Sequence, residues 1–397
     1  MRTAPLAVTH RHARKLARVL GITRVTDITR LDTVGVPVFA SIRPDASRGS
    51  LCVNAGKGLR FAEASVGAYM EAIEFAFAEY NRAGLPVVTA PAAAVYEGAS
   101  REDAILDFCP QLGTEIPLDT PIACVTADDV VTGEPFLVPA ELVFLPFPAT
   151  AGSPRYFGSS SNGLASGNTV IEASVHGLAE VIERDIRSFY AMDEVSALVD
   201  PSTFPPSLRR LLGAIGRAGL TLYVRSVPND YRLPYFTATI VDEHRIDPLF
   251  VNGGHGCHPS RDIALTRAIT EALQSRLTFI HGGRDDLTEA YDRYEGWTPE
   301  QRTGHAQRVI AIAARPDGTI RFDDVTADPA PADLEGLWST LVAAVMRVHR
   351  TRILRVTYTP AALPLQVVRI LVPGLEFFTV ASARVGRRLG DHVCRLC

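Results

Sequence analysis

The most regular pattern of apolar and polar positions lies in three segments that resemble one another. They are residues 64–74, "ASVGAYMEAIE", residues 173–185, "ASVHGLAEVIERD", and residues 264–276, "ALTRAITEALQSR". In and just after the first segment, apolar side chains recur at i, i+4, i+7 and i+11, the spacing of one helix face: Val66, Met70, Ile73 and Phe77. The pattern predicts three related helices.

Runs rich in β-branched and aromatic residues lie between these predicted helices. The clearest are VGVPVFASI, FLVPAELVFLPF, TLYVRSV, FTATIVD and LQVVRILV. Residues 240–254, "IVDEHRIDPLFVNGG", suggest a hairpin followed by a glycine turn, and residues 282–332 suggest a polar surface excursion. The mixture predicts an α+β (mixed α/β) fold in which helices pack on a largely antiparallel sheet.

Each predicted helix carries two polar side chains three residues apart, which places both on one helix face. The pairs are Glu71 with Glu74, Glu180 with Glu183, and Glu271 with Gln274. A solvated helix face with Glu–Arg pairing explains any single pair, but three copies at the same offsets indicate a shared site. Clustered carboxylates repel one another unless cations lie between them, and Mg²⁺ combines carboxylates with substrate phosphates. The three helices are therefore predicted to converge on a site for a nucleotide and Mg²⁺.

No Walker motif accompanies these acids, because "VNAGKG" lacks the GxxxxGK[ST] spacing. Lys57 lies in that segment, in an apparent glycine turn, and is one of two lysines against 38 arginines. A lysine among glycines suits a phosphate, although a solvent-exposed turn lysine gives the same pattern. The loop from Phe157 to Asn168, "FGSSSNGLASGN", offers donors to a phosphate or ribose, and its alternative is an ordinary polar turn.

The composition of the 397 residues, 47% hydrophobic and 21% charged, is that of a globular protein. A formal net charge of −4 gives no argument for nucleic acid or a membrane surface as partner. No apolar run is long enough for a membrane span.

Six sparse cysteines predict free thiols in a reducing cytoplasm. The CxxC formed by Cys394 and Cys397 lacks the second pair that a zinc site needs, and suits a flexible redox pair or an incidental tail.

Together these segments resemble the YcaO family. The matching stretches are "NAGKG", "ASVGAYMEAIE", "SNGLASGNTVIEASVHGLAEVIERD", "ALTRAITEALQSR" and "VPGLE", spread over residues 54–376. The resemblance implies an ATP-binding fold of its own kind, with ATP and Mg²⁺ as cofactors at a central site. One position departs from the family pattern: Ala165 stands where Ser is frequent, and the adjacent Ser166 is its candidate substitute.

Carried over by position, the resemblance assigns roles to individual residues. The implied metal ligands are Glu71, Glu74, Glu180, Glu183 and Glu271. The implied nucleotide-binding residues are Lys57, Ser166, Asn168, Glu172, Arg184 and Gln274. Lys57 and Arg184 are also the expected catalytic residues, with Arg184 steadying the charge that is transferred.

The family resemblance implies activation of a peptide amide: a nucleophile adds to the carbonyl, ATP phosphorylates the oxygen, and phosphate leaves. A neighbouring Cys, Ser or Thr side chain as nucleophile gives an azoline, and an external sulfur donor gives a thioamide. Residues 29–45, "TRLDTVGVPVFASIRPD", resemble the TfuA-associated, thioamide-forming branch. The chain ends without the Pro-rich tail common in azoline-forming members. We therefore expect backbone thioamidation rather than cyclodehydration. The expected setting is peptide natural-product (RiPP) biosynthesis or protein modification. Accessory methylthiolation chemistry and a non-catalytic peptide-binding subunit remain as alternatives.

The implied partners are a peptide or protein substrate, a TfuA-like protein and a sulfur donor, and a homodimer is compatible with the sequence. We expect a basic N-terminal helical segment over residues 1–30, an ATP-binding catalytic domain over residues 31–385, and a C-terminal tail over residues 386–397. The amphipathic stretch "RKLARVL" in the first segment suits a solvated helix or a docking surface for a peptide or partner.

Overall fold

A computed structural model describes residues 2–96, 104–148, 155–316, 318–329 and 331–396. The α-helices are α1 (Leu6–Val19), α2 (Phe61–Ala78), α3 (Tyr80–Ala83), α4 (Val170–Asp193), α5 (Arg209–Arg217), α6 (Arg261–His281), α7 (Leu287–Asp292), α8 (Pro299–Ala314), α9 (Leu334–Val348) and α10 (Arg387–Leu396). The strands are β1 (Arg24–Asp27), β2 (Val38–Ile42), β3 (Val53–Lys57), β4 (Val88–Pro91), β5 (Pro121–Asp129), β6 (Pro135–Pro139), β7 (Leu164–Gly167), β8 (Ala197–Leu198), β9 (Leu220–Ser226), β10 (Tyr235–Asp242), β11 (Val251–Cys257), β12 (Leu354–Thr357) and β13 (Gln366–Leu371).

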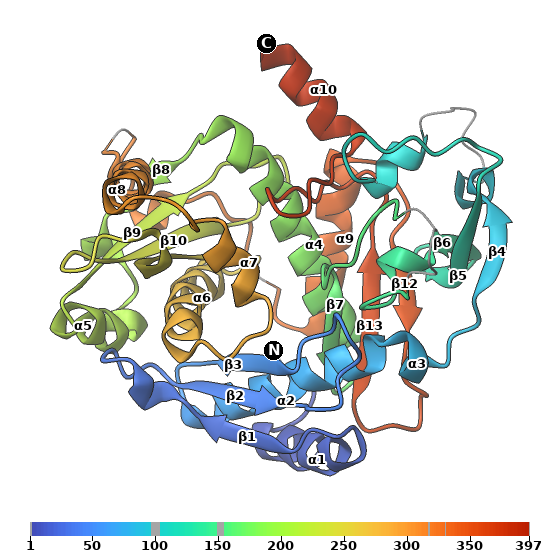
Figure 1. The fold of residues 1–397 in the computed structure, drawn as a ribbon, viewed down its shortest axis with the longest axis horizontal. Coiled ribbons are helices and arrows are strands. Elements are labelled where there is room, and N and C mark those ends of the chain that lie inside the picture. Colours follow the sequence, from blue (N-terminus) through green and yellow to red (C-terminus); the bar gives the residue numbers. More distant parts are fainter. Residues whose placement is uncertain (1, 97–103, 149–154, 317, 330, 397) are drawn as a thin grey trace.

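The strands form three sheets around the helices (Figure 1). The first has the order β1-β2-β3, the second β11-β10-β9-β8, and the third β4-β5-β12-β13-β7 with β6 paired to β5. All the pairings between these strands are antiparallel. The predicted fold, with helices packed on largely antiparallel sheet, is confirmed.

Each of the three predicted helices follows the edge strand of one sheet and packs on it: α2 on β3, α4 on β7, and α6 on β11. Strand glycines make this packing close. A Cβ atom on Gly56 would lie 2.2 Å from the carbonyl oxygen of Ala64, and one on Gly256 would lie 2.1 Å from that of Ala264. These two alanines are equivalent in the repeats, so a strand glycine facing a helix alanine is part of the repeated unit.

The glycines that suggest turns in the sequence lie in strands instead. Residues 251–254 belong to β11, Lys57 ends β3, and Leu164–Gly167, in the middle of the predicted polar loop, forms β7. The physical reason is that glycine lets a strand approach a helix backbone as well as allowing a turn. The polar stretch over residues 282–332 also contains α8, which packs on the second sheet and buries Ala306 and Ala313.

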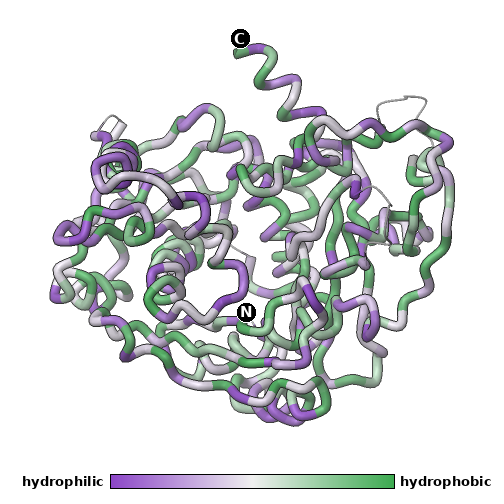
Figure 2. Tube along the Cα trace, in the orientation of Figure 1, coloured by the Kyte–Doolittle hydropathy of each residue, from purple (hydrophilic) through white to green (hydrophobic). Residues whose placement is uncertain are grey.

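The two ends of the chain lie differently in the fold. Near the N-terminus, α1 packs along α2, and β1 joins β2 in the first sheet. At the other end, α10 projects from the body, with hydrophilic and hydrophobic residues alternating along it (Figure 2).

Free thiols are found at Cys52, Cys109, Cys124, Cys257 and Cys394, whereas Cys397 lies outside the described residues. Within the described part, every helix is too short or too polar to cross a membrane.

Candidate active site

The three acidic helices meet through a cyclic set of contacts. Besides its own strand, α2 contacts β7, α4 contacts β11, and α6 contacts β3. Each contacted strand is the edge of its sheet, so its outward backbone groups need partners. We call the place where these helices and edge strands meet the three-helix junction. The predicted convergence is confirmed, although the roles assigned to individual residues remain predictions.

The second polar residue of each helical pair joins its helix to the next edge strand. Ser166 of β7 donates through Oγ to Glu74 Oε1 (2.5 Å), and the backbone N–H of Cys257 in β11 donates to Glu183 Oε2 (3.0 Å). Gln274 Nε2 donates to the carbonyl oxygen of Ala55 in β3 (2.8 Å). The third copy carries an amide because the atom it meets is an acceptor, whereas the two glutamates meet donors.

Replacing Gln274 by glutamate tests this explanation. In Gln274→Glu a carboxylate faces the Ala55 carbonyl oxygen and cannot donate to it, so we expect a loss of about 2 kcal/mol in the free energy of unfolding. Urea unfolding measures the change, and the loss should shrink at low pH, where the protonated acid can donate. An unchanged unfolding midpoint at neutral pH would show that the amide is not required.

The first residue of each pair faces cations or an N–H group. Glu271 pairs with Lys57 (Oε2–Nζ 3.0 Å), and Glu180 pairs with Arg184 of the same helix (3.6 Å). Glu71 accepts a hydrogen bond from the backbone N–H of Ala55 (3.1 Å). The Lys57–Glu271 pair joins β3 to α6, so a lysine near the start of the chain reaches the third repeat.

The electrostatics of the junction favour a bound cation. Burial, together with the neighbouring carboxylates Glu71 and Glu180, raises the pKa of Glu74 to about 8. Burial also raises the pKa of Glu180 to about 7, with Glu183 and Glu271 adding to the shift and Arg184 opposing it. Burial favours the neutral form of Glu271, but the charges of Lys57 and Arg184 outweigh it and lower the pKa of that carboxyl. Burial and the neighbouring carboxylates thus favour the protonated forms of Glu74 and Glu180, and a bound cation would favour their charged forms.

The donor set fits Mg²⁺ only in part. Five carboxylates that the sequence predicts as metal ligands lie around the junction, and oxygen is the donor that Mg²⁺ prefers. In the part of the chain that the structure describes, no three His, Cys, Asp or Glu side chains come together closely enough to hold a metal ion. This is the arrangement expected where phosphates and water complete the coordination.

Asn168 and Glu172 lie at the start of α4 and are engaged by the N-terminal segment. Asn168 Nδ2 donates to both carboxylate oxygens of Glu172 (3.0 Å each) and its Oδ1 accepts from Thr9 Oγ1 (2.8 Å). Thr3 donates to Glu172 Oε2 through its backbone N–H (3.1 Å) and its hydroxyl (2.6 Å). Both contacts of Thr3 thus occupy one carboxylate oxygen of Glu172, Oε2.

Arg187 and His255 are among the polar residues at the junction that sequence reasoning missed. Arg187 follows Arg184 by three residues on α4, and the charges of both arginines help to lower the pKa of His255, after the larger effect of burial. His255 lies on the edge strand β11. The three-residue spacing from Arg184 could have indicated Arg187, since both point from one helix face. Nothing in the sequence places His255 beside them.

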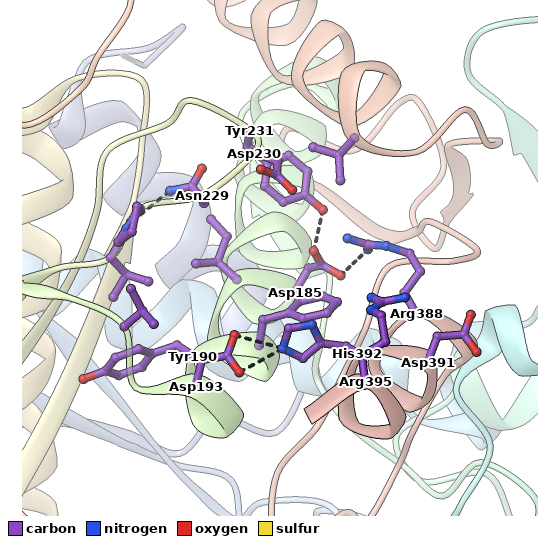
Figure 3. A pocket seen from close by; sticks show the side chains of 16 residues that line it. Asp185, Tyr190, Asp193, Asn229, Asp230, Tyr231, Arg388, Asp391, His392 and Arg395 are labelled. Atoms are coloured by element: carbon purple, nitrogen blue, oxygen red, sulfur yellow. Dashed lines mark hydrogen bonds and ion pairs between the residues drawn. The ribbon is translucent and has the colours of Figure 1, made fainter. Parts of the chain in front are cut away.

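A separate pocket of about 470 Å³ lies on the opposite face of α4. Figure 3 shows Asp185 pointing toward Tyr231 and Arg388, and Asp193 pointing toward His392. Asp185 is buried and accepts from the Tyr231 hydroxyl (2.6 Å) and from Arg388 Nη1 (2.7 Å). His392 Nε2 lies 2.9 Å from the Asp193 carboxylate. These contacts attach α10 to the back of the helix that carries Glu180 and Arg184.

Removing the arginine of this network should destabilise the fold. Arg388→Ala leaves the buried Asp185 carboxylate without its cationic partner, and we expect a loss of about 2 kcal/mol in the free energy of unfolding. The matched control is Arg395→Ala, because Arg395 lines the same pocket but is exposed, and it should change that free energy by under about 0.5 kcal/mol. Equal losses in chemical denaturation would contradict a structural role for the Asp185–Arg388 pair.

Comparisons with known proteins agree on one family. Residues 55–376 match the family model described as YcaO cyclodehydratase, which binds ATP and Mg²⁺. An uncharacterized protein from Methanothermobacter thermautotrophicus is 34% identical over 94% of this chain and 95% of its own length. A protein from Rhizobium leguminosarum bv. trifolii, named for its position in the tfuA 3′ region, is 34% identical over 90% of this chain and 84% of its own. The structure of YcaO from Methanopyrus kandleri bound with AMPPCP and Mg²⁺ matches with a TM-score of 0.74, at 25% identity over 98% of this chain and 95% of that one.

Proposed function

The chain belongs to the YcaO family of ATP- and Mg²⁺-binding proteins, and from this premise we propose that it replaces a peptide backbone amide oxygen by sulfur at the expense of ATP. The observation that carries the proposal is the three-helix junction, where Lys57 and Arg184 lie among five carboxylates. Cations beside a group of acids suit a polyphosphate with its metal ions. We place this activity in the cytoplasm and in the domain over residues 31–385.

The proposed reaction balances without a further redox partner. Hydrosulfide adds to the carbonyl carbon, and the C=O π bond becomes a C–O⁻ bond. That oxygen attacks the γ-phosphorus of ATP and releases ADP. The C–O bond then breaks, C=S forms, and the proton of the hydrosulfide leaves with the hydrogen phosphate that carries the former amide oxygen.

The junction residues divide these tasks by their charge. Glu71, Glu74, Glu180, Glu183 and Glu271 would hold Mg²⁺, which neutralises polyphosphate charge when bound. Lys57 extends from the end of β3 to Glu271 and is placed to bind a phosphate as a compact charge. Arg184 is already paired with Glu180 at 3.6 Å, and its planar guanidinium suits the γ-phosphate oxygens during transfer.

Two observations support sulfur rather than a substrate side chain as the nucleophile. One is the name of the Rhizobium relative, which places it beside tfuA. The other is the resemblance of Thr29 to Asp45 to the thioamide-forming branch. A TfuA-like protein that delivers sulfide is therefore the proposed partner. Cyclodehydration of a Cys, Ser or Thr residue is the second candidate, since the family model carries the name cyclodehydratase.

Mass spectrometry distinguishes the two reactions. A candidate precursor peptide is incubated with this protein, Mg-ATP, sulfide and a TfuA-like protein. Thioamidation raises the peptide mass by the difference between sulfur and oxygen, and requires both ATP and the sulfur source. A product lighter by one water, formed without any sulfur source, would reject thioamidation and support the cyclodehydratase. Glu180→Gln is the inactive control.

A further inference from the structure

Arg187 is a half-buried cation at the three-helix junction. It lies on the face of α4 that carries Glu180, Glu183 and Arg184, because positions 180, 183, 184 and 187 fall on one side of a helix. Its guanidinium is half-buried and forms no hydrogen bond or ion pair with any described residue. Burial and the neighbouring charge of Arg184 lower its pKa. A desolvated, unpaired charge destabilises a fold, so its presence here points to an anionic ligand.

His255 supplies a second donor beside this arginine. The Tyr235 hydroxyl is fully buried and lies 2.9 Å from His255 Nδ1. Burial raises the pKa of Tyr235 well above its usual value, so the phenol stays protonated, and we assign it as the donor to Nδ1. Burial and the charge of Arg187 lower the pKa of His255 to about 3. The neutral ring therefore carries its own proton on Nε2 and can donate it.

We propose that Arg187 and the Nε2–H of His255 form an oxyanion subsite for the oxygen that passes from the peptide carbonyl to phosphorus. The inference rests on the proposed function and identifies the side of the site that the peptide enters. Along α4 the charge changes from Glu180 and Glu183 to Arg184 and Arg187. The acids therefore face the metal-bound polyphosphate, and the cationic end faces the acceptor oxygen.

Charge on that oxygen makes such a subsite useful. The oxygen is neutral in the amide, becomes negative when the nucleophile adds, and leaves as part of inorganic phosphate. Donors held in place in a buried site stabilise the developing charge without reorganisation. Arg187 is free for this task, whereas Arg184 is already paired with Glu180. The subsite would bind this oxyanion whether the nucleophile that adds to the carbonyl is sulfide or a side chain of the substrate.

Inorganic phosphate is a stable probe of this subsite, because it contains the transferred oxygen. We expect isothermal titration calorimetry to show phosphate binding to the complex of the whole protein with Mg-ADP. Arg187→Gln should weaken phosphate binding by roughly tenfold or more and change the affinity for Mg-ADP by less than about twofold. His255→Phe removes the imidazole donor and should weaken phosphate binding in the same direction. The control is Arg210→Gln, since Arg210 is exposed on α5.

Several outcomes would overturn the subsite. The first is that the Mg-ADP complex of the wild type binds no phosphate. The second is that Arg187→Gln leaves the phosphate affinity unchanged. The third is that Arg187→Gln lowers the affinities for phosphate and for Mg-ADP equally. A general folding defect is recognised by thermal melting, in which Arg187→Gln should match or exceed the wild type because an unpaired charge is removed. If phosphate binding behaves as expected but no peptide is modified, the proposed reaction is rejected, and Arg187 and His255 remain a phosphate site without a role in oxygen transfer.

Discussion

Replacing Glu180 by glutamine is expected to abolish ATP turnover while the protein keeps or gains thermal stability. Burial, together with Glu183 and Glu271, raises the pKa of the Glu180 carboxyl to about 7. A neutral amide of the same shape relieves this repulsion in the ligand-free protein. The same change removes a carboxylate from the predicted metal ligands, and we expect turnover to fall by at least about a hundredfold.

Thermal melting with and without Mg-ATP measures both parts of this prediction. The wild type should melt at a higher temperature with the ligand, whereas Glu180→Gln should show little shift and a ligand-free melting temperature no lower than the wild type. Glu295→Gln is the control, because Glu295 is exposed and lies between α7 and α8, outside the three helices of the junction. A Glu180→Gln variant that retains the full ligand-induced shift would remove Glu180 from the metal ligands.

Adding one methyl group to Gly254 should break the packing of α6 on β11. A Cβ atom there would lie 2.2 Å from the backbone nitrogen of Ala272 and 2.3 Å from the carbonyl oxygen of Ala268. Neither contact can be relieved by a side-chain rotation, so the helix must move. We expect Gly254→Ala to lower the free energy of unfolding by about 4 kcal/mol or more and to weaken Mg-ATP binding, because Glu271 moves with α6.

The adjacent glycine gives a matched control on the same strand. A Cβ atom on Gly253 would lie no closer than 3.9 Å to any atom beyond the adjacent residues, and that atom is the carbonyl oxygen of Ala238. Gly253→Ala should therefore change the free energy of unfolding by less than about 1 kcal/mol. Urea unfolding of the two variants compares the same chemical change at neighbouring positions. Similar losses of the free energy of unfolding in both variants would refute the role assigned to close helix–strand contact.

The helices and their convergence could be predicted because the repeat is local. The stripe beginning at Val66, the paired polar positions and the repeated Ala-Ser-Val opening all lie within single helices. Apart from the Glu180–Arg184 pair within α4, the partners of the paired polar residues could not be predicted, because they lie on strands outside the repeated helices. Glu183, for example, meets the N–H of Cys257, and Gln274 meets the carbonyl of Ala55.

The glycines show how one residue type gives the wrong prediction for a physical reason. Sequence alone associates "VNGG" and "NAGKG" with turns, since glycine allows turn conformations. In the fold Gly254 lies in β11 and Gly56 lies in β3, where each makes room for the backbone of a helix, α6 and α2 respectively. The difference depends on which helix packs against the strand, and that information is absent from the local sequence.

The central claim is that ATP and its metal ions bind at the junction of α2, α4 and α6. A crystal structure of the protein with AMPPCP and Mn²⁺ in place of Mg²⁺ tests it directly, because manganese is located by its anomalous scattering. We predict manganese among Glu71, Glu74, Glu180, Glu183 and Glu271, with phosphates near Lys57 and Arg184 and Thr3 displaced from Glu172. An ordered nucleotide elsewhere, for example in the pocket beside α10, with no manganese among these acids would contradict the account.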